Sequence, residues 1–288
     1  MMKFIITLLI SFFCYLSVFA NELPDLGDSS QLIISAKEEQ AIARAILKEV
    51  AVSHEIVQDI EVIDYLRNLG DRLVAYSPNK RQQFNFFVVN ESSINAFAML
   101  GGVIGVHTGL ILASNSESEV ASVLGHEIAH VTQRHLPRMI AQQKNDSIKT
   151  VLGIALALLV ARANPQLSAG TMTAASAMGV QKQLDYTREH EKEADRVGFQ
   201  ILTDAGFDGR SMVSFFNTLQ RGSRFSEGAA PSFLRTHPIT TDRISDISNR
   251  VKESRYKQIP DNPDFIFIKS KLRASNGTPQ SAVDEFEG

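Results

Sequence analysis

Three features are scarce in this sequence: cysteine, a net excess of charge, and long apolar runs. Cys14 is the single cysteine among 288 residues, so neither an intrachain disulfide nor a cysteine-ligated metal site is possible. The 29 basic and 32 acidic residues give a formal net charge of −3. This balance argues against a nucleic-acid-binding protein, because such proteins usually carry a strongly basic face. Because a cysteine-ligated site is excluded, any bound metal is expected to have nitrogen and oxygen ligands.

The remaining composition is that of a folded globular protein. Hydrophobic residues make up 44% of the chain and charged residues 21%, a balance that argues against disorder. A chain of 288 residues is long enough for one sizeable core or two modest domains.

The first 20 residues have the pattern of a secretory signal peptide. Lys3 supplies a positive charge, residues 4–13 are almost wholly apolar, and the segment ends with Val18-Phe19-Ala20, in which small residues occupy the positions that a signal peptidase reads. The apolar stretch is shorter than the about 20 residues of a membrane-spanning helix, so an uncleaved anchor is the less favoured alternative. We therefore expect an exported protein that is cleaved after residue 20.

Both helices and strands are expected before residue 110. The capping box SAKE at residues 35–38 predicts a helix that starts at Ser35, and apolar spacing predicts a second helix at 59–76. Three β segments are expected next, at residues 84–89, 94–100 and 103–108. Gly101-Gly102, between the last two segments, predicts a tight hairpin turn.

The following helix carries the motif HEIAH at residues 126–130. Its start at 115–119 is rich in capping and acidic residues, and it is expected to continue to about residue 136, where Pro137 would kink or end it. Positions i and i+4 share one helical face, so His126 and His130 can bind one ion, and neutral imidazole suits Zn²⁺. Glu127 points about 100° away and can serve as the general base for a metal-activated water.

A catalytic zinc site also needs a third protein ligand. In the segment EKEAD at residues 191–195, Glu191 and Asp195 share a predicted helical face. Glu191 can then reach the metal, and Asp195 can reach the N–H of a ligating histidine. His190 is the rival ligand, which would give a three-histidine site but has no partner acid on its own face. Glu193 faces elsewhere and is expected to be a surface charge.

Two further histidines are assigned by their sequence positions. His135 lies five residues past His130, off the metal-binding face, and is expected at the surface. His237 lies in a loop-like segment, residues 231–241. It is either a structural loop histidine or a group that approaches the metal, as a fourth ligand at rest or as a donor to a tetrahedral oxyanion.

The other segments are less informative about chemistry. Residues 151–161 form an apolar run too short to span a bilayer as a helix. They predict a buried core helix or, less favoured, a hydrophobic lid or a membrane-contacting interfacial segment near the active site. Residues 186–202 and 215–219 are expected to be helical. The segments 264–273 and 279–286 predict a helix pair that would begin a tetratricopeptide-like array, which needs about three repeats to be stable.

The motifs HEIAH and EKEAD together resemble the gluzincin peptidases that include the CAAX prenyl proteases and the HtpX heat-shock proteases. Four further segments extend the resemblance: INAFA at 94–98, Gly101-Gly102, ASVLGHEIAHVTQRHL at 121–136, and LRTHP at 234–238. They are similar to the periplasmic β-barrel assembly-enhancing proteases, over most of residues 22–272.

The resemblance implies roles for specific residues. The implied zinc ligands are His126, His130 and Glu191. Glu127 would be the general base, and His237 would be the loop histidine that caps the metal and holds the enzyme latent. The implied edge strand beside the cleft, where an extended substrate can pair, contains Asn95, Ala96 and Phe97.

These observations predict an α+β, mostly helical, zincin-like metallopeptidase with a small β-sheet whose edge strand borders the active-site cleft. Residues 1–20 would be the signal peptide, 21–255 the peptidase domain, and 262–288 a helical C-terminal segment. We expect a periplasmic endopeptidase with one Zn²⁺ per chain. Its substrates would be unfolded or misassembled envelope proteins, and its partner the outer-membrane assembly machinery. The alternatives are a chaperone-like protein with a latent protease site and, less favoured, a structural zinc site with four protein ligands.

Overall fold

The computed structural model describes residues 34–142, 188–225, 232–254, 260 and 262–275. Its elements are α2 (Ala36–Val52), α3 (Ile60–Val74), β1 (Asn85–Val89), β2 (Ala96–Met99), β3 (Val103–His107), α4 (Thr108–Ala113), α5 (Glu117–Thr132), α6 (His135–Gln142), α10 (Arg188–Asp204), α11 (Arg210–Phe225), α12 (Ser232–Thr236), α13 (Thr241–Glu253) and α14 (Pro263–Ser275). The predictions for residues 1–20, 151–161 and 279–286 lie outside the described residues.

The three described strands form one sheet in the order β1-β3-β2. β1 is parallel to β3, and β2 pairs with β3 in antiparallel register, with Ala96 opposite Val106 and Met99 opposite Val103. The β2–β3 turn is formed by Gly101 and Gly102, whose φ angles are 75° and 79°. Two successive positive φ angles favour glycine at both positions, so the predicted hairpin is confirmed.

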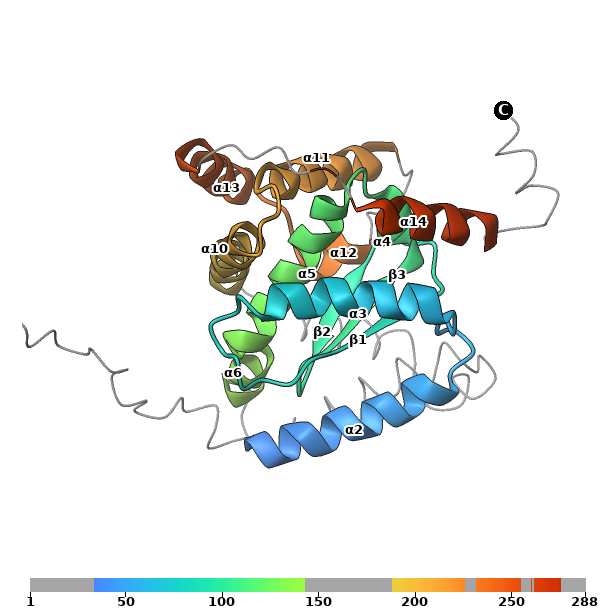
Figure 1. The fold of residues 1–288 in the computed structure, drawn as a ribbon. Coiled ribbons are helices and arrows are strands. Elements are labelled where there is room, and N and C mark those ends of the chain that lie inside the picture. Colours follow the sequence, from blue (N-terminus) through green and yellow to red (C-terminus); the bar gives the residue numbers. More distant parts are fainter. Residues whose placement is uncertain (1–33, 143–187, 226–231, 255–259, 261, 276–288) are drawn as a thin grey trace, which may run out of the picture.

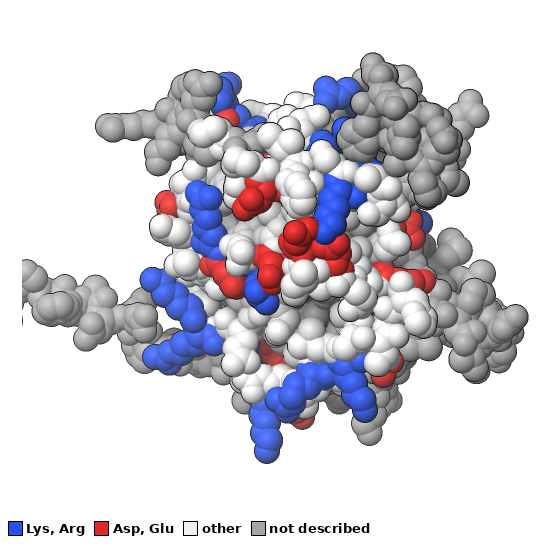
Figure 2. Space-filling view, turned by 45° about the vertical axis from the view of Figure 1, so that its right-hand side comes forward, with Lys and Arg blue, Asp and Glu red and all other residues white. Residues whose placement is uncertain are grey.

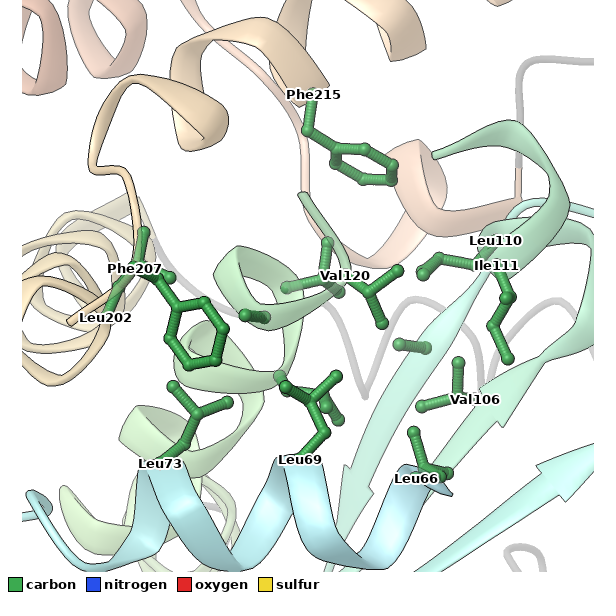
Figure 3. Close-up of a cluster of buried hydrophobic side chains, with 14 of the residues drawn as sticks. Leu66, Leu69, Leu73, Val106, Leu110, Ile111, Val120, Leu202, Phe207 and Phe215 are labelled. Carbon is green, nitrogen blue, oxygen red and sulfur yellow. The ribbon is translucent and has the colours of Figure 1, made fainter. Parts of the chain in front are cut away.

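Helices cover both faces of this sheet. On one face, Phe87, Val89 and Val103 pack with apolar residues of α2. On the other face, Val88, Ile104 and Val106 belong to the main core, together with residues of α3, α5, α10 and α11. Figure 1 shows α3 lying across the sheet, and Figure 3 shows the leucines of α3 pointing towards α5 and β3. The predicted α+β class with a small sheet is confirmed.

Local capping signals set the predicted helix starts. Ser35 and Glu38 form the reciprocal capping box at the start of α2. The carboxylate of Asp59 accepts from the first turn of α3, and Ser116 accepts from the backbone N–H of Glu119 in α5. Each side chain satisfies backbone N–H groups that have no partner within the helix.

α5 is the central helix of the main core. Its residues from Glu117 to His130 are all buried. α10 lies along it, and the two helices approach most closely where Gly125 faces Gly198, because a Cβ on Gly198 would lie 2.9 Å from the backbone nitrogen of His126. This close approach brings the side chains of α10 next to the HEIAH motif of α5.

Two sequence predictions about helix and loop bounds are wrong. α5 ends at Thr132 rather than near residue 136, because Arg134 adopts a left-handed φ of 55° that turns the chain into a new helix, α6, with Pro137 in its first turn. The segment 231–241 is not wholly a loop, because it contains the short helix α12.

Surface charge and helix hydropathy give two further observations. Figure 2 shows basic and acidic side chains interspersed on one face, with a group of acidic side chains near its middle. Among the described residues, no helix combines the length and apolarity that crossing a membrane requires.

Candidate metal centre

Four potential metal ligands meet at the junction of three elements. They are His126 and His130 of α5, Glu191 of α10, and His237 directly after α12. One ligand atom from each lies within 4.8 Å of the other three, and all four residues are buried. The sequence separates these groups by up to 111 positions, so packing between elements brings Glu191 and His237 to the histidine pair of α5.

The spacing of these ligand atoms fits a small tetrahedral cation. Nε2 of His126 lies 2.9 Å from Nε2 of His130 and 3.3 Å from Nδ1 of His237. Oε1 of Glu191 lies 3.3 Å from Nε2 of His130 and 2.9 Å from Nδ1 of His237. Tetrahedral zinc with bonds of 2.0–2.1 Å requires ligand–ligand separations of about 3.3 Å. The group therefore has the dimensions of a zinc site.

Each element holds its ligand for a local reason. His126 and His130 share a face of α5 because they are four residues apart. His237 is fixed by α12: its backbone N–H donates to the carbonyl of Phe233, and its ring stacks on Phe233 with centroids 4.6 Å apart. The N–H of Phe233 in turn donates to the carbonyl of Ile94, just before β2. The position of His237 is thus tied to the edge strand.

A buried arginine organises the carboxylates around this group. Arg243 of α13 donates from Nε and Nη2 to the two carboxylate oxygens of Asp195, at 2.6 and 2.7 Å. Its Nη1 lies 2.8 Å from the carbonyl of Pro238 and 2.7 Å from Oε2 of Glu191. Oδ1 of Asp195 lies 3.0 Å from Nδ1 of His126. Asp195 therefore lies where the sequence placed it, next to a histidine of the group, whereas Arg243 was missed.

No short-range sequence signal identifies Arg243. It lies near the start of a different helix, and only its burial, with 2% exposed surface, reveals that it needs acidic partners. Its bidentate contact with Asp195 is the geometry in which a guanidinium binds a carboxylate most strongly.

Glu127 is buried beside the four potential ligands. Neither of its carboxylate oxygens makes a side-chain hydrogen bond of good geometry in the described part of the chain, and Nε2 of His237 lies 3.5 Å from Oε1. Burial raises the pKa of Glu127, against the opposing effect of His237 and His126. A buried carboxylate without hydrogen-bond partners is costly unless a water or a cation completes its contacts.

The neighbouring groups have different pKa shifts. Burial alone would raise the pKa of Glu191, but the charge of His237 and hydrogen bonds from His126 and His130 hold it well below its ordinary value. Burial and the charge of His126 lower the pKa of His130 well below its ordinary value. Glu191 is thus ionised and His130 neutral, which are the forms in which these side chains bind metals. Against the effect of burial, hydrogen bonds to Asp195 and Glu191 raise the pKa of His126 to about 10, so a bound metal would have to displace a proton from His126.

Three further residues near the centre, His135, Glu193 and His190, were given roles from the sequence. His135 is fully buried rather than on the surface, with Nδ1 2.9 Å from Nδ1 of His130. Burial lowers the pKa of His135 to about 4, against the opposing effect of the hydrogen bond that His135 donates to Glu193. Glu193 is not an isolated surface charge, because Oε2 contacts both His135 and Arg138. His190, the rival ligand, lies outside the four-residue group and stacks on His135.

The three residues predicted on the edge strand lie at the start of β2. Ala96 and Phe97 belong to β2, and the carbonyl of Asn95 accepts from the N–H of His107 in β3. β2 is an edge of the described sheet. A small hollow lies between the end of β2 and the motif helix, lined by Glu39, Ala98, Met99, Leu100, Gly101, His130, Val131, Leu136 and Pro137.

Comparison with known proteins is consistent with this geometry. The model of peptidase family M48 matches residues 63–251, which is more than half of the chain and includes all four potential ligands. The chain belongs to peptidase family M48. M48 membership confirms the prediction of a metallopeptidase and implies a bound metal, usually zinc.

Several M48-like relatives are similar over most of the chain. The β-barrel assembly-enhancing protease of Escherichia coli (strain K12) is 34% identical over 252 residues, which cover 88% of this chain and 52% of the relative. The protein of that name from Yersinia pestis is 34% identical over 261 residues, 91% of this chain and 54% of the relative. Metalloprotease YcaL of Escherichia coli (strain K12) is 30% identical over 176 residues, which cover 59% of this chain and 63% of the relative. The chain spans about half the length of the first two relatives.

Proposed function

We propose that this chain is a zinc-dependent endopeptidase whose metal ligands are His126, His130 and Glu191. One observation carries the proposal: the two imidazoles and the carboxylate are buried together, with ligand atoms 2.9–3.5 Å apart. Glu127, with no side-chain hydrogen-bond partner among the described residues, lies on the same turn of α5. This arrangement combines a metal site with an adjacent base.

Each residue has a definite chemical role in this proposal. Zinc would supply a Lewis acid and lower the pKa of the attacking water. Glu127 would accept the proton of that water and pass it to the leaving amine, because it is the carboxylate without a fixed partner. Asp195 would hold the ring of His126 in place, and Arg243 would hold Asp195. His237 would donate to the developing oxyanion after moving out of the ligand group.

Substrate binding is proposed at the edge of β2. An extended substrate segment would pair with the edge strand at Asn95, Ala96 and Phe97 and so bring its carbonyl towards the metal. The hollow beside β2 reaches His130, which supports the same path.

The proposed setting is the periplasm. We assign residues 1–20 to a signal peptide, 21–255 to the peptidase domain, and 262–288 to a helical C-terminal segment that includes α14. The substrates would be misassembled outer-membrane proteins, and the assembly machinery of these proteins would be a partner. Support comes from the N-terminal sequence pattern and from the relatives, which are named for β-barrel assembly.

The burial of His237 supports a latent resting state. With His237 as a fourth protein ligand, no ligand position remains for a substrate carbonyl, so the protein would hold clients without cutting them. This observation keeps the chaperone-like alternative open. A four-ligand site is also what a structural zinc requires. The variants below distinguish the endopeptidase from a structural zinc site.

The decisive experiment compares cleavage of an unfolded β-barrel protein by wild type, His237→Ala, and His237→Ala combined with Glu127→Gln. We expect His237→Ala to cleave faster than wild type. Adding Glu127→Gln should lower cleavage about 10²- to 10⁴-fold while zinc remains bound. Metal analysis of Glu191→Ala provides the control, and zinc should be lost. Equal cleavage with and without Glu127→Gln would refute the endopeptidase. A structural site would show zinc loss in His237→Ala and no cleavage by any variant.

A further inference from the structure

A second set of polar contacts extends outward from His130, away from the four potential ligands. Nδ1 of His130 lies 2.9 Å from Nδ1 of His135. Nε2 of His135 lies 3.1 Å from Oε2 of Glu193, and the same oxygen accepts from Nη1 of Arg138 at 3.2 Å. The contacts thus run from a buried histidine of the proposed metal site to a partly exposed ion pair on α6 and α10.

The chemistry of these groups fixes where the protons lie. A carboxylate only accepts hydrogen bonds, so Nε2 of His135 is the donor to Glu193. In a neutral imidazole the other nitrogen is then an acceptor, and Nδ1 of His135 accepts from Nδ1–H of His130. The lone pair of His130 is left on Nε2, the nitrogen that faces His126 and Glu191. That tautomer is the one able to bind a metal.

The backbone between the two histidines is shaped to make this contact. In a continuous helix, His135 would point away from His130, five residues before it. Arg134 instead adopts a left-handed φ of 55°, which is unfavourable for a residue with a side chain. The side chain of Arg134 forms an ion pair of 2.7 Å with Glu39 of α2. The turn brings the ring of His135 to within 4.8 Å of the ring of His130.

His135 is also held from its other side. Its ring stacks on His190, with centroids 4.5 Å apart and an angle of 23° between the planes. With no exposed surface and a stacked neighbour, the ring of His135 cannot swing away from His130 without disturbing α10.

We infer that His135, oriented by Glu193, is a positioning residue that sets the tautomer and the ring orientation of His130 for metal binding. The inference rests on the proposed metal site. It assigns a role to a histidine that lies outside the HEIAH motif. It also explains why α5 ends at Thr132 instead of continuing.

The test compares two substitutions of His135 by their zinc affinity, measured by competition with a chromogenic chelator. His135→Phe keeps the ring and its stacking on His190 but removes both nitrogens. We expect its zinc affinity to fall about 10- to 100-fold. In His135→Asn, the side-chain oxygen takes the place of Nδ1 and can accept from His130, so we expect affinity within about five-fold of wild type. The visible spectrum of the Co²⁺-loaded chain should change in the first variant and be retained in the second.

Glu193 provides a variant that the fold tolerates more easily, because 28% of its side chain is exposed. Glu193→Ala should weaken zinc binding roughly three- to ten-fold, a smaller loss than that of His135→Phe because Glu193 acts one contact further from the metal. Glu189→Ala removes an exposed carboxylate from the same helix and should leave zinc binding unchanged.

Two results would overturn the inference while leaving the metal centre intact. One is wild-type zinc affinity in both His135→Phe and Glu193→Ala. The other is equal weakening in His135→Phe and His135→Asn, which would show that His135 only fills space. A wild-type chain that binds no zinc would overturn the metal centre, and this inference with it.

Discussion

The contact between α5 and α10 predicts that Gly198→Ala destabilises the protein and weakens its metal site. A Cβ at Gly198 would lie 2.9 Å from the backbone nitrogen of His126 and 3.0 Å from the carbonyl carbon and oxygen of Gly125. These are backbone atoms of a fully buried helix, which cannot move aside as a flexible side chain would. The added methyl group must therefore push α10 away from α5.

Two opposing energies decide the size of the effect. Replacing glycine by alanine inside a helix stabilises the helix by about 1 kcal/mol. Overpacking a tight core costs about 1–3 kcal/mol. The cost here should lie near the upper end of this range, because the added Cβ meets backbone atoms of both Gly125 and His126. We therefore expect a net loss of about 2 kcal/mol in unfolding free energy. For a domain of this size, that corresponds to a fall of roughly 4–8 °C in Tm.

The same shift should reach the metal site. Glu191 lies on α10 two turns before Gly198, and His126 lies at the contact point on α5. Moving α10 outward would lengthen the separation between Glu191 and His126, which is 3.5 Å. The assays are urea unfolding of the metal-free chain and zinc competition with a chelator. Lower values are expected in both.

Gly125→Ala is the matched control on the opposite helix. Its Cβ would meet only the carbonyl oxygen of Gly198 closely, at 3.1 Å, so the helix-propensity gain should nearly offset the clash. Gly198→Ala should therefore be the more destabilised of the two. Equal stability of the two variants, or a more stable Gly198→Ala, would refute the reasoning that backbone contact controls this interface.

Three further predictions follow from the fold and the site. Arg243→Lys should lower the unfolding free energy by about 2 kcal/mol, because lysine cannot make the bidentate contact with Asp195. Chemical denaturation measures this loss, and an unchanged denaturation midpoint would contradict the prediction. Gly101→Ala should cost about 2 kcal/mol, since φ is 75° and the added Cβ would lie 2.6 Å from the carbonyl oxygen of Glu39; a thermal melt equal to wild type would refute this. Removing zinc with a chelator should lower unfolding free energy by about 4 kcal/mol, relative to zinc at 1,000 times its Kd, and re-addition should restore the thermal midpoint.

Local rules of sequence account for the parts of the fold that form locally. The capping box at Ser35, the cap at Asp59 and the hairpin at Gly101-Gly102 each depend on a few neighbouring residues, and each is found in the structure. The pairing of His126 with His130 belongs to the same class, because helical geometry alone brings them together.

The missed features depend on contacts between distant segments. The end of α5 carries no glycine to mark it, because the left-handed residue is Arg134, whose side chain pairs with Glu39, 95 positions earlier. The burial of His135 follows from that turn and could not be predicted from helical spacing. Arg243 was missed for a similar reason, since its partner Asp195 lies on another helix 48 positions away.

The balance of buried charge gives a final reason to expect a divalent cation at this centre. With the histidines in the neutral form that binds metals, the described, buried side chains with formal charge around the four potential ligands are Glu127, Glu191, Asp195 and Arg243. Arg243 offsets one of the three carboxylates when all are ionised, which leaves two negative charges in a site shielded from water. Uncompensated buried charge is strongly unfavourable. A divalent cation neutralises both charges, and it would lower the raised pKa of Glu127 so that the carboxylate can act as a base.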